Sequence, residues 1–190
     1  MPSSKDFFKK FKGDVWIETG TYMGAGVLQA IDAGYNRIVS IELSEQFANS
    51  AKDKFKTCSN VEIINNNAHE VLFDLLCTFS KDQRLVFWLD AHYSMCGTAG
   101  ENDPQPLLKE LAAIEKWKKL TSSLLPIILI DDMRTFNYTD CAFGEREIKE
   151  SILRIDEKYL FTKHDGFQEN TQRIYKNDIL AAIPEHYVTA

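Results

Sequence analysis

The stretch VWIETGTYMGAG, residues 15–26, decides the fold because an apolar run stops at an acid and continues directly into glycines. The residues up to Glu18 predict a buried strand, and Gly20, Gly24 and Gly26 predict a tight turn followed by a helix start. Glycine lets the backbone approach a ligand closely, and the N–H groups at a helix start favour polar or anionic groups. The order Glu-x-Gly-x-x-x-Gly-x-Gly departs from the dinucleotide fingerprint Gly-x-Gly-x-x-Gly. By itself the stretch therefore fits a glycine-rich turn of any α/β protein as well as a ligand site.

The composition is that of an ordinary globular protein. A length of 190 residues predicts one domain, 1–190, with a core of its own. The net charge of −6 argues against a general binder of phosphate backbones, so no nucleic-acid partner is expected. The four cysteines form no Cys-x-x-Cys pair, which favours reduced thiols in an intracellular protein. Because no span reaches membrane length and the N-terminus lacks a secretory apolar core, we expect a cytoplasmic protein without a membrane partner.

Strand and helix patterns alternate along the chain. A helix with Val27, Leu28 and Ile31 on one face is expected to end at Gly34, and Ser44 is expected to cap the next helix. A later helical stripe contains Ile148, Ile152, Ile155 and Tyr159, and residues 159–183 predict a closing antiparallel hairpin. Further strands are predicted at 37–43, 61–64, 85–90 and 126–130. The alternation predicts an α/β fold with a mostly parallel sheet and helices on both faces.

Polar residues follow the predicted strands at the edge where ligands of parallel sheets bind. Glu42 ends the second strand, where a ribose-binding acid lies in nucleotide-type folds, although a solvated strand-end carboxylate is the alternative. Asn67 follows the third strand, and contact with a purine edge or plain turn chemistry explains it equally well.

Acids gather after the fourth and fifth strands. Asp90 ends the continuous apolar run LVFWLD, His92 lies two residues beyond it, and Asp131 and Asp132 follow the next strand side by side. Adjacent carboxylates at a buried strand end are costly unless a cation or hydrogen-bond donors compensate for them. Carboxylate oxygens suit Mg²⁺, and a neutral imidazole next to a divalent ion can accept a hydroxyl proton near neutral pH. Residues 94–106 form a long Gly- and Pro-containing connection, which is either a substrate lid or an insertion.

The order ETGTYMGAG, IELS, WLDAHYS and LIDDMR, followed by a terminal hairpin, resembles a class I S-adenosylmethionine (SAM)-dependent methyltransferase from about residue 15 to residue 183. The resemblance implies the Rossmann-like methyltransferase fold, with the glycine loop at the methionine part of the cofactor and Glu42 at the ribose. It also implies an adenine contact at Asn67, although relatives often have Asp there. The cofactor-binding residues expected on this basis are Glu18, Gly20, Thr21, Gly24, Glu42, Asn67 and Asp90.

Within that family, LDAHYS together with IDD is similar to the macrocin-type metal-dependent O-methyltransferases. This similarity implies that Asp90, Asp131 and Asp132 bind Mg²⁺ and that His92 stands at the position of the catalytic base, where relatives have an acid. We therefore expect O-methylation of a sugar or another hydroxylated small molecule, with a second subunit as one way to complete the short chain's pocket. The alternatives are a SAM-binding protein without transferase activity and, disfavoured by the glycine spacing, a dinucleotide enzyme.

Overall fold

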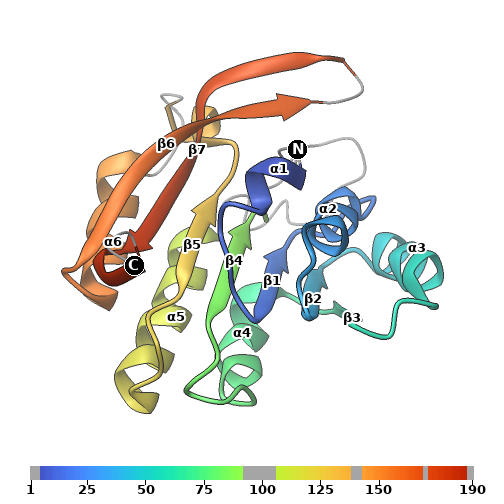
Figure 1. The fold of residues 1–190 in the computed structure, drawn as a ribbon, viewed down its shortest axis with the longest axis horizontal. Helices are drawn as coiled ribbons and strands as arrows, with labels where there is room; N and C mark the ends of the chain where they lie inside the picture. Colours follow the sequence, from blue (N-terminus) through green and yellow to red (C-terminus); the bar gives the residue numbers. More distant parts are fainter. Residues whose placement is uncertain (1–4, 92–105, 138–142, 169–170, 188–190) are drawn as a thin grey trace.

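A seven-stranded sheet organises the residues that the computed structural model describes, which are 5–91, 106–137, 143–168 and 171–187. The strands lie in the order β3-β2-β1-β4-β5-β7-β6 (Figure 1). They are β1 (Val15–Thr19), β2 (Arg37–Glu42), β3 (Val61–Asn65), β4 (Leu85–Leu89), β5 (Ile127–Ile130), β6 (Tyr159–Gln168) and β7 (Arg173–Pro184). The helices are α1 (Lys5–Phe8), α2 (Ala25–Ala33), α3 (Glu45–Phe55), α4 (Ala68–Leu76), α5 (Leu107–Thr121) and α6 (Glu145–Ile155), with 3-10 turns η1 (Met133–Asn137) and η2 (Glu185–Tyr187).

Strands β1 to β5 are parallel, whereas β7 is antiparallel to both of its neighbours, β5 and β6. The predicted α/β fold with a closing hairpin is therefore confirmed. The chain runs outward from β1 to β3 and then returns to β4 beside β1, which makes the β1–β4 boundary the switch point of the sheet. Because Thr19 pairs with Leu89, the next residues, Gly20 and Asp90, leave the sheet side by side.

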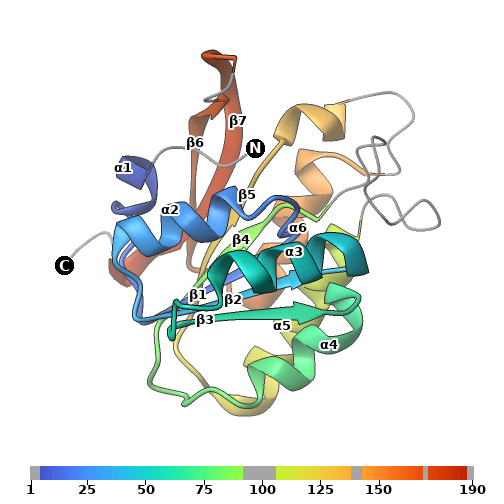
Figure 2. The same cartoon turned by 90° about the vertical axis from the view of Figure 1, so that its right-hand side faces the viewer.

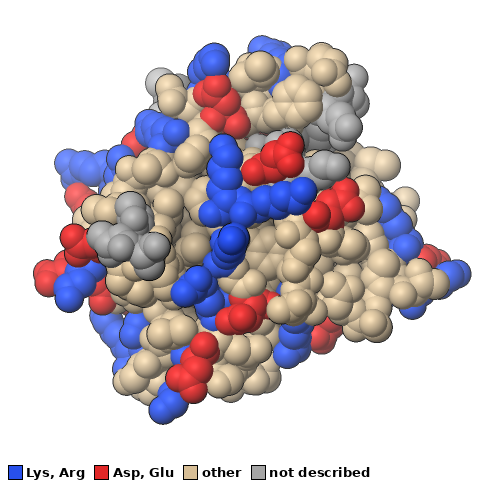
Figure 3. All heavy atoms as spheres, viewed as in Figure 1, with Lys and Arg blue, Asp and Glu red and all other residues tan. Residues whose placement is uncertain are grey.

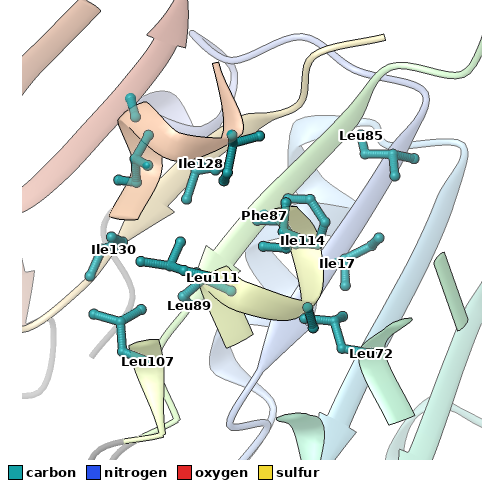
Figure 4. Packing of buried hydrophobic residues seen from close by; sticks show 14 of the residues in the cluster. Ile17, Leu72, Leu85, Phe87, Leu89, Leu107, Leu111, Ile114, Ile128 and Ile130 are labelled. Carbon is teal, nitrogen blue, oxygen red and sulfur yellow. The ribbon is translucent and has the colours of Figure 1, made fainter. Parts of the chain in front are cut away.

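Helices cover both faces of the sheet (Figure 2). Successive side chains of each strand point to opposite sides, and apolar side chains are buried on both sides. On one face, Ile17, Phe87 and Ile128 pack with α4, α5 and α6, and Figure 4 shows Leu111 and Ile114 of α5 among these strand side chains. On the other face the strand residues pack with α1, α2 and α3. The fully apolar sequences of β4 and β5 follow from this double burial.

Aromatic side chains join the N-terminal segment to the sheet. The Phe8 ring lies 4.5 Å from Trp16 and 4.9 Å from Trp88, centroid to centroid. The Tyr35 hydroxyl donates a hydrogen bond to the Phe11 carbonyl oxygen, which ties the end of this segment to the connection after α2. The segment therefore belongs to the core and closes one face of the sheet.

Two details of the predicted helices are wrong, and two capping predictions are confirmed. Leu28 is 46% exposed, because α2 buries Gly26, Val27 and Ala30 instead. Tyr159 opens β6 and does not extend the stripe of α6, since the helix ends at Asp156 in an extended conformation. Gly34 ends α2 with a left-handed backbone, and Ser44 caps α3 by accepting from the Phe47 N–H.

Among the described residues no helix combines the length and the apolar composition that crossing a membrane requires.

Candidate functional site

The glycine turn after β1 needs glycine for steric reasons. Gly20 and Gly24 have φ angles of 85° and 72°, in the left-handed region that disfavours other residues. At Gly20 a Cβ would lie 2.6 Å from the Asp90 carbonyl oxygen, so the turn passes directly over the end of β4. No side chain caps the start of α2 at Gly24, which leaves the first N–H groups of this helix directed at the turn. The turn thus has the backbone features that the sequence predicted for a ligand site.

Glu18 lies buried beneath the turn in a short chain of polar groups. Ser40 donates through its hydroxyl to Glu18 Oε2 at 2.5 Å, and the hydroxyls of Ser40 and Thr21 are 2.6 Å apart. Burial raises the pKa of Glu18 to about 8, and the negative charge of Asp90 adds to the shift. The side chain packs against Gly26, where a Cβ would lie 1.8 Å from Glu18 Oε1. Burial therefore favours the protonated form of Glu18, and its side chain supports the start of α2.

Glu42 connects the glycine turn with the start of α3. Its Oε2 accepts from the Tyr22 backbone N–H at 2.7 Å, and its Oε1 accepts from the Ser44 N–H at 2.8 Å. Each carboxylate oxygen can accept a second hydrogen bond, so the pair of oxygens suits the two hydroxyls of a ribose. The centroid of the Tyr22 ring lies 4.7 Å from that of Phe47. The geometry is compatible with the ribose-binding role predicted for Glu42.

Asn67 lies at the N-cap of α4, and its side-chain amide donates to Glu70 Oε1 at 3.3 Å. Its backbone N–H donates to the side-chain oxygen of Asn66 at 2.8 Å. These contacts are the turn chemistry that the asparagine-rich sequence predicted as one of two explanations. The predicted adenine contact stays a prediction.

At the ends of β4 and β5 the structure brings carboxylates close together. Asp90 is near enough to raise the pKa of Asp131, although burial is the main reason that this pKa lies well above its ordinary value. Both residues line a small pocket with Leu107 and Phe136. Glu110 of α5, which is 1% exposed, lines the same pocket and was not predicted. The sequence gives only a weak indication that Glu110 belongs to this pocket, namely that a charged residue lies three positions after Leu107 on the apolar face of α5.

A second carboxylate group lies beside η1 and includes an unpredicted residue. Asp131, Asp132 and Asp178 are all buried, and each offers an oxygen within 4.8 Å of those of the other two. Asp178 lies on β7, whose antiparallel direction brings its N-terminal half to the carboxyl end of β5. Asp90, the third metal ligand predicted from sequence, is not part of this group of described residues.

Arg134 supplies the positive charge at this group. It forms ion pairs with Asp178 and, at 2.6 Å, with Asp132 Oδ1, and its backbone N–H donates to Asp178 Oδ1 at 2.9 Å. Burial acts to lower the pKa of Arg134, but the two carboxylates outweigh it and raise the pKa above its ordinary value. Asp132 has a φ angle of 55°, so the backbone adopts an uncommon conformation directly after Asp131.

The predicted base His92, and most of the predicted lid at 94–106, lie outside the described residues.

Known proteins match this chain in structure. No protein-family model and no curated protein matches it. The O-methyltransferase of Bacillus cereus, solved with S-adenosylhomocysteine (SAH), is similar with a TM-score of 0.61 and 16% identity over 94% of this chain and 78% of that one. The O-methyltransferase TomG of Streptomyces achromogenes, involved in tomaymycin synthesis and solved with SAM, gives a TM-score of 0.62 and 15% identity over 95% and 77%.

A protein of Clostridium thermocellum, for which an rRNA methylase function has been suggested, gives a TM-score of 0.58 and 15% identity over 97% and 98% of the two chains. Structural similarity at such identities establishes a fold and leaves the activity to the residues of the site. This chain has the Rossmann-like methyltransferase fold that its sequence predicts.

Proposed function

We propose that this protein is a SAM-dependent methyltransferase that methylates a hydroxyl group of a small molecule with the help of a divalent metal ion. The observation that supports it is the division of the sheet edge into two parts. Glu18 and Glu42 lie beside the glycine turn that begins at Gly20. Asp90 follows β4, and Asp131 and Asp132 follow β5. One part suits a cofactor with a ribose and a charged amino acid moiety, and the other suits a cation and an acceptor.

In the proposed reaction the chain's own groups mainly bind and orient. Glu42 would accept hydrogen bonds from the ribose hydroxyls, and the turn at Gly20 would lie beside the methionine part. The acceptor oxygen forms a bond to the methyl carbon as the carbon–sulfur bond of SAM breaks, and the hydroxyl proton passes to a base, for which the sequence offers His92. Holding the two reactants in line would be the main task of the protein in such a transfer.

The donor chemistry of the acid group fits a hard divalent cation such as Mg²⁺. Asp131 and Asp132 would hold it, with Asp90 as the sequence-predicted third ligand. When bound, such an ion supplies a positive charge that lowers the pKa of an acceptor hydroxyl.

The experiment combines cofactor binding with methyl transfer. We expect calorimetry to detect SAH binding to the wild type and to Asp131→Asn/Asp132→Asn, and we expect a metabolite extract with labelled SAM to yield a methylated small molecule only with the wild type and Mg²⁺. Transfer by the double variant with unchanged Mg²⁺ dependence would refute the metal part. SAH binding without any methylated product would instead favour a SAM-binding protein that is not a transferase.

The surface bears on the acceptor class. Figure 3 shows a short run of Lys and Arg side chains across one face, bordered by Asp and Glu. The net charge of −6 and the acids that border this run favour a small acceptor over a nucleic acid. Methylated RNA in the same extract assay would contradict that preference.

A further inference from the structure

Arg134 is held at the acid group from several sides. Its guanidinium pairs with Asp132 and Asp178, and it lies 4.1 Å from the centroid of the Tyr175 ring. The backbone N–H of the same residue donates to Asp178 Oδ1. Its side chain is 35% exposed, whereas Asp132 and Asp178 are 7% and 2% exposed. Arg134 is therefore more exposed to water than either acid with which it pairs.

The guanidinium pairs with two of the three acids that could hold a cation. Asp131, Asp132 and Asp178 each offer one oxygen within 4.8 Å of those of the other two, a spacing that one coordination sphere can span. Arg134 lies 2.6 Å from Asp132 Oδ1 and contacts Asp178 Oδ2. A guanidinium and a divalent ion cannot approach the same oxygen from the same side, and their like charges repel each other.

We propose that Arg134 is a resident counter-cation that a divalent ion must displace from Asp132, an inference that rests on the metal part of the proposed function. Displacement requires only the guanidinium to move, because the backbone bond from Arg134 to Asp178 keeps η1 attached to β7. The released guanidinium can remain on Asp178 and on the Tyr175 ring. Arg134 thereby sets the metal affinity of the site and neutralises Asp132 when the metal is absent.

A matched pair of variants tests this proposal. Arg173 lies 4.7 Å from the same Tyr175 ring centroid and forms no ion pair within the described part of the chain. We expect Arg134→Gln to tighten Mn²⁺ binding by about tenfold or more, because a competing positive charge leaves the site. Arg173→Gln should leave the affinity unchanged. Affinities are measured by the electron paramagnetic resonance signal of free Mn²⁺, without SAM or acceptor.

Three results would overturn the proposal: equal or weaker binding by Arg134→Gln, equal tightening by Arg173→Gln, or no Mn²⁺ binding by any of the proteins. If Arg134→Gln does not fold, the wild type provides a second measurement. The Arg134 side-chain N–H resonance, assigned by its loss in Arg134→Lys, should shift on addition of Mg²⁺, and a resonance that stays in place during Mg²⁺ binding refutes displacement. Methyl transfer is assayed separately. If the protein transfers no methyl group but Arg134→Gln still binds Mn²⁺ more tightly than the wild type, the proposed function is wrong and this inference stands.

Discussion

Replacing Gly20 by alanine tests whether the glycine turn is as tightly placed over β4 as the structure shows. The new Cβ would lie 2.6 Å from the Asp90 carbonyl oxygen and 3.1 Å from the Ala91 nitrogen, both backbone atoms that no side-chain rotation can move. The left-handed φ of 85° costs about 1–2 kcal/mol for a residue with a Cβ. Overpacking against fixed atoms adds about 1–3 kcal/mol, so Gly20→Ala should destabilise the protein by about 2–5 kcal/mol.

Gly34→Ala is the matched control. Gly34 has a φ of 89°, but a Cβ there would meet nothing within 4 Å, so only the conformational cost of about 1–2 kcal/mol applies. Urea unfolding followed by the fluorescence of the buried Trp16, Trp88 and Trp117 gives both free energies. Gly20→Ala should also lose SAH binding, whereas Gly34→Ala should retain it. Equal destabilisation by the two substitutions would mean that the close approach of the turn to β4 is wrong.

Three further predictions follow from the buried polar groups. Burial raises the pKa of Glu18 in the folded protein to about 8, above the ordinary carboxyl pKa of 4.5 that applies to the unfolded chain. The free energy of unfolding should therefore fall as pH rises across that interval, and Glu18→Gln should flatten the slope in urea titrations. Glu42→Gln should weaken SAH binding by about 10- to 100-fold in calorimetry, while Glu62→Gln, an exposed control paired with Arg37, should have no effect. Tyr35→Phe leaves the Phe11 carbonyl without this donor and should cost about 1–2 kcal/mol in thermal unfolding, and an unchanged midpoint would contradict the bond.

The fold was predictable because its periodicities are local. Strands buried on both faces are continuous apolar runs, and Gly34 and Ser44 mark helix ends through their own conformations and hydroxyl groups. Tyr159 was assigned both to the helical stripe and to the start of the hairpin, since its spacing from Ile155 suits a helix equally well; only the second assignment is correct. What decides its place is a distant contact, the hydrogen bond from its hydroxyl to the Pro126 carbonyl oxygen at 2.8 Å.

The candidate site could be predicted only where it lies at the carboxyl end of a parallel strand. Glu18 and Glu42 lie in the last two positions of β1 and β2, and Asp90, Asp131 and Asp132 follow β4 and β5, so their position at one edge of the sheet follows from topology.

The residues that were missed depend on register or on helix orientation. Asp178 reaches the site because Leu180 pairs with Ile130, and a shift of one residue in that pairing would turn it to the other face. Glu110 lies on the buried face of α5, which a single charged position in an apolar stripe does not reveal. Arg134 follows the two acids in sequence, but its partner on β7 could not be found by spacing alone.

The position of β7 between β5 and β6 has a consequence for synthesis on the ribosome. The five parallel strands and the glycine turn emerge first, whereas β7, which joins β6 to the rest of the sheet, is the last strand to emerge. Until β7 arrives, the apolar strand Ile127–Ile130 has an open edge to which another nascent chain can pair. The ion pair between Arg134 and Asp178 forms only when β7 pairs with β5. The group of three acids is therefore complete only in chains in which β7 has covered that edge.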